Sequence, residues 1–187
     1  MGLIDDVFAD LRSGIQKAHD ALRRDLARLR TGRASVSLLD GIRVDYYGTP
    51  TPLNQMASLS TPDPRTIFVK PWDKSVVSAI EKAIRQSDLG VNPMSDGELV
   101  RIPIPPLTEE RRKDLVKIAR KNGEESKVAI RGARREAREL LEQLESDGDV
   151  PADEVAQALK KVETEIETSV KKVDEIVANK EKEIMEV

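Results

Sequence analysis

Apolar residues recur at spacings of three and four along three long segments of the chain, and this pattern predicts three amphipathic helices. The first covers about 2–30, where Thr31 and Gly32 end it, because glycine is the usual residue just past a helix end. The second covers about 108–145, and the third follows a turn at 146–151. Three long helices therefore make up most of the chain.

Each helix has a narrow apolar stripe. The first stripe comprises Ile4, Phe8, Leu11, Ile15, Ala18, Leu22 and Leu29, with Leu26 beside a break at Asp25. The second is rich in small residues, which allow partner helices to approach closely, and comprises Leu115, Ala119, Asn122, Ser126, Ala129, Ala133, Ala137, Leu140 and Leu144. The third comprises Val155, Leu159, Val162, Ile166, Val170, Val173, Val177 and Ile184. Such stripes are buried only against one another, which predicts a long antiparallel three-helix bundle.

The segment between the first and second helices has a different composition. Nine of the ten prolines lie within 50–106, and every aromatic residue except Phe8 lies within 46–72. Strands are expected at 42–47, 66–70 and 99–104, and a helix is expected at 75–87, with Asp73 as its cap and Gly90 beyond its end. The predicted fold is therefore α+β, with a small β/α/β domain at 32–106 inserted into a bundle formed by 1–31 and 107–187.

Two short connections join the predicted domains, at 31–33 and 103–106. Glycine permits changes in φ and ψ on one side, whereas prolines stiffen the other side. Two interpretations are open: a hinge of limited freedom, or a fixed elbow with one packed orientation. The hinge residues would be Thr31, Gly32, Arg33, Pro103, Ile104, Pro105 and Pro106.

Composition removes most enzyme classes. The chain has no cysteine, which excludes disulfides and thiolate chemistry, and its single histidine, His19, is expected to flank the core beside Ala18. Phosphate-binding loops, dinucleotide fingerprints and nucleophile elbows are absent, and carboxylates stand at helical spacings beside Lys and Arg, where ion pairing explains them. We therefore expect no enzyme activity, no cofactor and no metal site. No long apolar run and no signal-peptide pattern are found, so a cytoplasmic location is expected.

The segment KVAIRGARREAR, at 127–138, contains the main candidate for a binding site. Lys127, Arg131, Arg134 and Arg138 are spaced by four, three and four residues, and Arg135 widens the row. A row of guanidinium groups matches the geometry of phosphates in an RNA backbone. A solvated helix face is the alternative. The net charge of -3 makes a local basic patch stand out, and this favours binding of a polyanion.

Two further groups of residues have two interpretations each. The basic residues Arg23, Arg24, Arg28, Arg30 and Arg33 would bind RNA or compensate the dipole at the end of the first helix. The aromatic residues Tyr46, Tyr47, Phe68 and Trp72 would form a base-stacking platform or the core of the inserted domain. Arg65 and Lys70 are the only basic residues that lie among the aromatic ones, so we favour the core, while the tip of the domain remains a candidate protein-docking surface.

Four blocks along the chain resemble one known family. LRTGRAS at 29–35, YYGTPTPLNQMAS at 46–58, SDLGVNP at 87–93 and PPLTEERRKDL at 105–115 are similar, in this order, to the ribosome recycling factors of bacteria and organelles. The resemblance extends over essentially the whole chain. It implies a near-L-shaped protein with the dimensions of a transfer RNA, formed by a three-helix bundle and an inserted β/α/β domain.

The resemblance also implies a function. Such a factor binds the post-termination ribosome across the large-subunit tRNA sites. With elongation factor G and GTP it separates the subunits, and mRNA and deacylated tRNA are then released with the help of initiation factor three. The implied partners are therefore the ribosome, mainly its large-subunit rRNA, and the GTPase. A monomer without a membrane or a small-molecule substrate is expected. The competing hypotheses are a coiled-coil adaptor, with merely solvated arginines, and a hydrolase that uses surface carboxylates, which no spacing supports.

Residue by residue, the RNA-contacting arginines of the family correspond to Arg131, Arg134 and Arg135. Arg30 and Arg33 match its TGR block, where a contact with ribosomal RNA is also expected. Gly132 is a departure, because the family commonly has asparagine at this position. Glycine within a helix costs roughly 1 kcal/mol relative to alanine, so the presentation of the neighbouring arginines depends on local helix rigidity.

Overall fold

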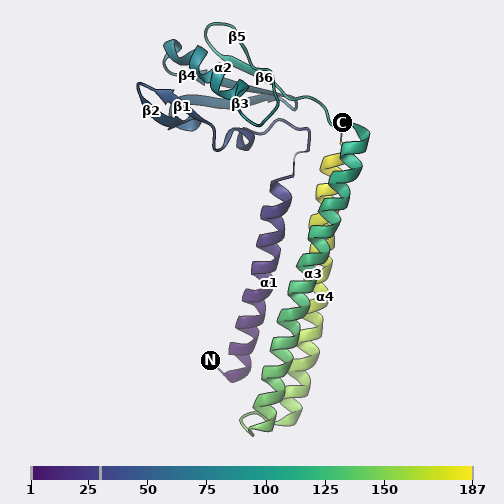
Figure 1. The fold of residues 1–187 in the computed structure, drawn as a ribbon. Coiled ribbons are helices and arrows are strands. Elements are labelled where there is room, and N and C mark those ends of the chain that lie inside the picture. Colours follow the sequence, from purple (N-terminus) through teal and green to yellow (C-terminus); the bar gives the residue numbers. More distant parts are fainter. Residues whose placement is uncertain (1, 30, 187) are drawn as a thin grey trace. The chain divides into compact units, whose positions relative to one another are not determined.

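The computed structural model describes residues 2–29 and 31–186, which form two compact units. One unit combines Met1–Arg30 with Glu109–Glu186, and the other is Thr31–Thr108. The first contains three long helices and the second contains the strands (Figure 1). The predicted α+β class is therefore confirmed.

Three long helices lie side by side in the first unit: α1 (Leu3–Ala27), α3 (Glu109–Ser146) and α4 (Ala152–Met185) (Figure 1). The Ser126 hydroxyl of α3 donates to the carbonyl oxygen of Ala18 in α1, and Gly14 lies against Ala133. Later residues of α1 therefore contact earlier residues of α3, so these two helices are antiparallel. α3 and α4 are also antiparallel, whereas α1 and α4 run parallel. This arrangement is the predicted three-helix bundle.

Aliphatic side chains fill the centre of the bundle. The stripes expected for α1 and α4 are largely correct, because most of their members are buried, and Leu26 is buried as well. The most deeply buried aliphatic residues of the bundle are Leu11, Leu22, Leu26, Leu115, Ile130, Leu141, Val155, Val162, Val173 and Ile184.

The apolar stripe expected for α3 is partly wrong. Ala129 is exposed and Leu140 is 46% exposed, whereas the adjacent Ile130 and Leu141 are completely buried. Gly123 likewise takes the buried place expected for Asn122. The prediction followed small residues at regular spacing, but α3 packs against two helices, and this contact decides which of two neighbouring residues is inside.

His19 is buried, so the expectation that it flanks the core is wrong. Its side chain is 7% exposed, and Nε2 lies 3.0 Å from the carbonyl oxygen of Ser169 in α4. Because a carbonyl oxygen only accepts, the ring donates this hydrogen bond. The contact gives a buried polar ring a partner across the interface between α1 and α4 and explains why a histidine is tolerated there.

Gly123 sets the closest approach of α3 and α4. A Cβ atom at this position would lie 2.7 Å from Cγ2 of Val177, which is well inside van der Waals contact. Valine has one strongly preferred χ1 rotamer in a helix, so its methyl group has little freedom to move away. The absence of a side chain at Gly123 therefore allows the two helix backbones to pack closely.

The second unit is antiparallel throughout. A hairpin of β1 (Arg43–Tyr46) and β2 (Thr49–Pro52) precedes a four-stranded sheet with the order β3-β4-β6-β5. The sheet strands are β3 (Ala57–Asp63), β4 (Thr66–Pro71), β5 (Met94–Ser95) and β6 (Val100–Pro103); α2 spans Val77–Arg85, and short 3₁₀ turns lie at Val36–Leu39, Leu53–Gln55 and Lys74–Val76.

The strands expected at 42–47, 66–70 and 99–104 and the helix expected at 75–87 are present as β1, β4, β6 and α2. Asp73 caps the helical segment as expected, since its Oδ1 accepts from the backbone N–H of Ser75 at 2.9 Å. Three strands were missed. β2 has the sequence TPTP and β3 is largely polar, so neither has the apolar alternation of a strand, and β5 has only two residues.

The core of the second unit is aliphatic, so the expectation that its aromatic residues form the core is wrong for Tyr47, Phe68 and Trp72, whereas Tyr46 is partly buried and packs against the core. Ile67, Val69, Ile80, Ile84, Val100 and Ile102 are completely buried. In contrast, Tyr47 is 80% exposed and Trp72 is 70% exposed. Phe68 lies between the buried Ile67 and Val69 and therefore points to the other face of the sheet, where the Arg101 guanidinium lies 5.3 Å from its ring centroid.

Two glycines of α3 provide a matched test of the close approach of the helices. Replacing Gly123 by alanine should destabilise the fold by about 1–3 kcal/mol, because the overpacked methyl group outweighs the better helix propensity of alanine. Gly132→Ala is the control: no atom lies within 4 Å of its added Cβ, so it should stabilise the protein by up to about 1 kcal/mol. Chemical denaturation of both variants measures this. Equal effects of the two substitutions would contradict the packing role of Gly123.

Candidate nucleic-acid interface

The candidate basic residues at 127–138 lie on uninterrupted helix in the middle of α3. With 3.6 residues per turn, they share one side of the helix but do not point in one direction. Lys127, Arg134 and Arg138 contact acids of α4, whereas Arg131 and Arg135 are exposed. The predicted row is therefore present, but it consists of two groups with different surroundings.

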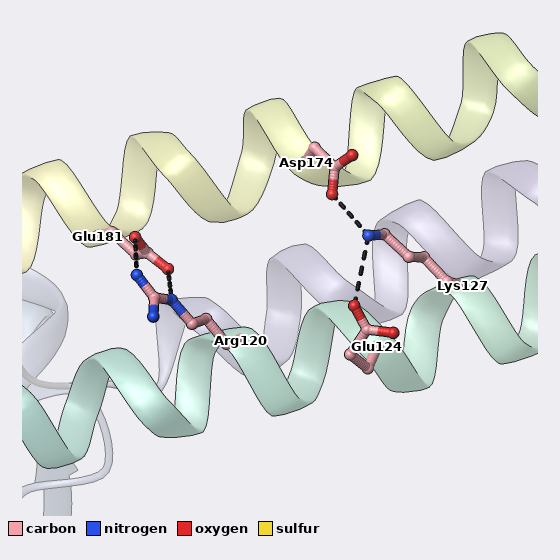
Figure 2. Close-up of polar contacts among 5 residues, drawn as sticks. All are labelled: Arg120, Glu124, Lys127, Asp174 and Glu181. Carbon is pink, nitrogen blue, oxygen red and sulfur yellow. Dashed lines mark hydrogen bonds and ion pairs between the residues drawn. The ribbon is translucent and has the colours of Figure 1, made fainter.

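Lys127 is the most enclosed of the five. Its ammonium lies 2.7 Å from Oδ1 of Asp174 in α4 and 3.3 Å from Oε1 of Glu124 in its own helix, and its side chain is 19% exposed (Figure 2). The hydrogen bond with Asp174, followed by that with Glu124, raises the pKa of the lysine above its ordinary value despite partial burial. Two carboxylates thus already neutralise this cation.

Arg120 lies two helical turns before Lys127 and makes a similar contact with α4. Its guanidinium donates to both carboxylate oxygens of Glu181, from Nε at 2.5 Å and from a terminal nitrogen at 3.2 Å (Figure 2). These two ion pairs lie on either side of Gly123 along α3. The close backbone approach at Gly123 therefore brings the side chains of the two helices within reach of each other.

Arg134 and Arg138 share one carboxylate oxygen. Oε1 of Glu163 in α4 accepts from Nε of Arg134 at 2.9 Å and from a terminal nitrogen of Arg138 at 3.0 Å. These arginines lower the pKa of Glu163, with the hydrogen bond from Arg134 as the largest cause. Arg138 also lies 3.7 Å from Glu142, while the side chains of Arg134 and Arg138 remain 41% and 38% exposed.

Arg131 and Arg135 point to solvent. Arg131 has no hydrogen bond or ion pair among the residues that the structure describes. Arg135 lies 4.0 Å from Glu139, at the limit of an ion pair, and its side chain is 76% exposed. Arg135 lies about one turn from Arg131, so these two exposed guanidinium groups place positive charge side by side on this face of α3. This group is chemically suited to bind phosphate oxygens.

The acids that neutralise part of the row were missed by sequence reasoning. No acidic residue lies between Lys127 and Arg135 in the sequence, but Glu163 is 29 residues from Arg134 and 25 from Arg138. Only the pairing of α3 with α4 brings them together. This pairing could have been found by aligning the apolar stripes of the two helices as antiparallel partners around the turn at 146–151.

The second basic cluster is less well organised. Arg23 and Arg28 lie 3.5 and 3.9 Å from Asp20 and Asp25 near the end of α1, and both are well exposed. Arg33 is exposed and belongs to the second unit. Arg30 lies outside the described residues. The arrangement at the end of α1 fits the dipole-compensation interpretation as well as it fits RNA binding.

The two predicted hinge segments approach each other within the second unit. Gly32 has a φ of +74°, and a Cβ on it would lie 3.2 Å from Cγ of Leu107. Pro103 belongs to β6, and the backbone N–H of Ile104 donates to the carbonyl oxygen of Arg65 at 2.7 Å. The sheet therefore holds Pro103 and Ile104, while Pro105 and Pro106 follow the end of the sheet pairing.

The described residues contain neither a metal-binding cluster nor a membrane-spanning helix. Among the described residues, no group of three or more His, Cys, Asp or Glu side chains could hold a metal ion. No helix of the described chain is long and apolar enough to cross a membrane.

Comparison with known protein families shows to which family the chain belongs. A model of the family described as Ribosome recycling factor matches residues 22–185. The chain belongs to the ribosome recycling factor family. Curated ribosome-recycling factors of Sorangium cellulosum and Anaeromyxobacter dehalogenans (strain 2CP-C) are 59% and 58% identical, covering 99% and 100% of this chain and all of each relative. The resemblance seen in the four sequence blocks is thereby confirmed.

Solved structures of ribosome recycling factors have the same fold. A solution structure of a ribosome recycling factor has a TM-score of 0.75 and 38% identity, with complete coverage of both chains. A second structure has a TM-score of 0.63 and 46% identity, also with complete coverage. Its title describes models for the T. thermophilus ribosome recycling factor and the E. coli elongation factor G bound to the E. coli post-termination complex.

The carboxylate that Arg134 and Arg138 share leads to a prediction about how stability depends on pH. Because Arg134 and Arg138 lower the pKa of Glu163 in the folded state, its contribution to stability is present above the unfolded value of about 4.5 and is lost as pH falls through the lower folded value. Glu163→Gln should therefore lower the free energy of unfolding at pH 7, by less than about 1 kcal/mol, because solvent screens this half-exposed group. The difference from the unsubstituted protein should shrink as pH falls below about 4.5 and disappear once the carboxyl group is protonated in the folded state as well. Denaturation across this pH range measures it, and a variant more stable at pH 7 would contradict it.

Proposed function

We propose that this protein recycles ribosomes after termination. It binds the post-termination ribosome across the large-subunit tRNA sites and, with elongation factor G and GTP, separates the subunits. Messenger RNA and deacylated tRNA are then released for another round of translation. Family membership over the full chain supports this proposal, as does the related structure whose title names a recycling factor and elongation factor G on a post-termination complex.

The bundle is anchored on large-subunit rRNA by the basic residues of α3. The observation that carries this step is the exposed Arg131, which has no partner among the described residues and lies next to the exposed Arg135. Phosphate needs no ion pair to be broken before it binds Arg131. Arg134 and Arg138 extend the contact after they exchange their carboxylate partner for phosphate. Lys127 contributes least to this contact, because two acids enclose and neutralise it.

The two connections serve as a hinge between a bundle domain and an inserted domain. Thr31 and Gly32 form one side, and Gly32 already has a conformation that favours glycine. On the other side Pro105 and Pro106 stiffen the chain after the end of the sheet pairing. A force that elongation factor G applies to the inserted domain is then transmitted to the stiff bundle. The bundle in turn strains the contacts between the two ribosomal subunits.

The protein is not an enzyme in this mechanism. Separation of the subunits requires no covalent bond to be broken by the factor, and GTP hydrolysis belongs to elongation factor G. The factor acts as a cytoplasmic monomer. The alternative of a coiled-coil adaptor differs in one respect that is easy to measure, because it requires no affinity for ribosomes at moderate salt.

Replacing Arg131 by alanine tests the anchor. Loss of one charge-assisted contact should weaken binding to purified large subunits about tenfold or more. It should also make the slope of log K against log salt less steep by about 0.7–0.9. Lys121→Ala is the control, because it removes the same charge from an exposed position of the same helix, ten residues away. Sedimentation binding from low to moderate salt measures both quantities.

Two outcomes would count against the anchor or the whole function. Equal losses for Arg131→Ala and Lys121→Ala would show that only net charge matters. Absence of ribosome binding by the unsubstituted protein at moderate salt would favour the adaptor.

The stiffness of the proline connection can be tested separately. In a Pro105→Gly/Pro106→Gly variant the connection becomes flexible, so ribosome binding should stay within about twofold while GTPase-dependent splitting falls severalfold. Pro62→Gly/Pro64→Gly is the control, since it makes the same change around the turn between β3 and β4. Light scattering after rapid mixing measures splitting. Equal splitting rates for the two variants would refute a stiff transmitting connection.

A further inference from the structure

Glu163 of α4 lies between two arginines of α3. A single oxygen, Oε1, accepts from both Arg134 and Arg138, so the carboxylate sits between the two guanidinium groups. The side chain of Glu163 is 44% exposed, and those of the arginines are exposed to a similar degree. An RNA phosphate could therefore reach this cluster without separation of α3 from α4.

We propose that Glu163 is an internal competitor of RNA phosphate that sets the affinity of the basic face of α3 for RNA. In the free protein its carboxylate neutralises Arg134 and Arg138. Before either arginine binds a phosphate, its contact with Glu163 must be broken, and the carboxylate is left near the bound RNA. This inference rests on the proposed function, because it assumes that the face binds ribosomal RNA.

The other acid facing this row does not have the same role. Asp174 contacts Lys127, but that lysine is also held by Glu124 and is the least exposed member of the row. A phosphate that displaced Asp174 would contact only the ammonium of Lys127, which is enclosed and still paired with Glu124. At Glu163 the two cations are guanidinium groups, which bind a phosphate with directed hydrogen bonds. Only Glu142 offers Arg138 a further acidic contact, at 3.7 Å.

Competition has two measurable consequences. Exposed ion pairs contribute at most about 1 kcal/mol each, so removal of the carboxylate should tighten RNA binding by about threefold to tenfold rather than by orders of magnitude. Salt dependence should change as well. Without Glu163 the cluster has one more net positive charge with which to neutralise phosphate, so the slope of log K against log salt should be steeper by up to about 0.9.

Glu163→Gln tests the proposal with Glu167→Gln as the matched control. Both substitutions remove one negative charge from α4, one helical turn apart, but Glu167 pairs with Lys171 in its own helix and not with the arginines of α3. Binding of the full-length proteins to purified large ribosomal subunits is measured from low to moderate salt. We expect Glu163→Gln to bind about threefold to tenfold more tightly, and Glu167→Gln to change binding less than twofold. Thermal unfolding verifies that both variants are folded.

Equal tightening by both variants would overturn the proposal, because net charge alone would then explain the change. Weaker binding by Glu163→Gln would also overturn it, since Glu163 would then orient the arginines instead of competing with phosphate. A double-mutant cycle adds a second criterion. In an Arg134→Ala/Arg138→Ala background Glu163→Gln should no longer tighten binding, because the arginines it competes for are gone.

The same cycle separates this inference from the proposed function. If Arg134→Ala/Arg138→Ala weakens binding while Glu163→Gln has no effect beyond that of Glu167→Gln, only the competitor role fails. If neither the arginine substitutions nor Glu163→Gln alter binding, the RNA-anchoring role of this face fails and the competitor role fails with it.

Discussion

The close packing of α3 against α4 is the constraint on which the bundle and its candidate interface depend. Gly123 has no room for a side chain beside Val177, so the two backbones approach closely at this point. Ion pairs then form across the same contact, from Arg120 to Glu181 and from Lys127 to Asp174. Individually such exposed pairs are weak. Their value is in fixing the register of two long helices, which in turn decides where the remaining arginines point.

This register gives the basic residues of α3 different surroundings. A cation that faces α4 meets a carboxylate, whereas Arg131 and Arg135 face away and keep their charge available. Arg134 and Arg138 lie between these extremes, because they are paired with Glu163 but still half-exposed. A protein with a net charge of -3 thus keeps a locally basic surface, which we propose binds RNA, without a generally basic composition. In our proposal, the cations along α3 differ in how far acids neutralise them. This arrangement favours RNA segments that offer several phosphates together.

Local patterns predicted much of this structure, and contacts between distant segments account for the failures. The β-branched run at 66–70 and the heptad stripes of α1 and α4 were sufficient to find β4 and two helices. The choice between Ala129 and Ile130 as a core residue depends on two partner helices, so spacing within α3 did not settle it. Glu163 is invisible as a partner of Arg134 until α4 is folded back, and the exposure of Trp72 reflects a sheet whose aliphatic residues already fill its core.

The most direct test of the account is a sucrose-gradient assay of ribosome splitting. Post-termination ribosomes are mixed with this protein, elongation factor G and GTP, each also omitted in turn, with an initiation factor present to keep separated subunits apart. The account predicts loss of the intact ribosome peak only when all components are present. An unchanged peak in the complete mixture with a matched GTPase would contradict it and would leave a ribosome recycling factor fold without the recycling activity.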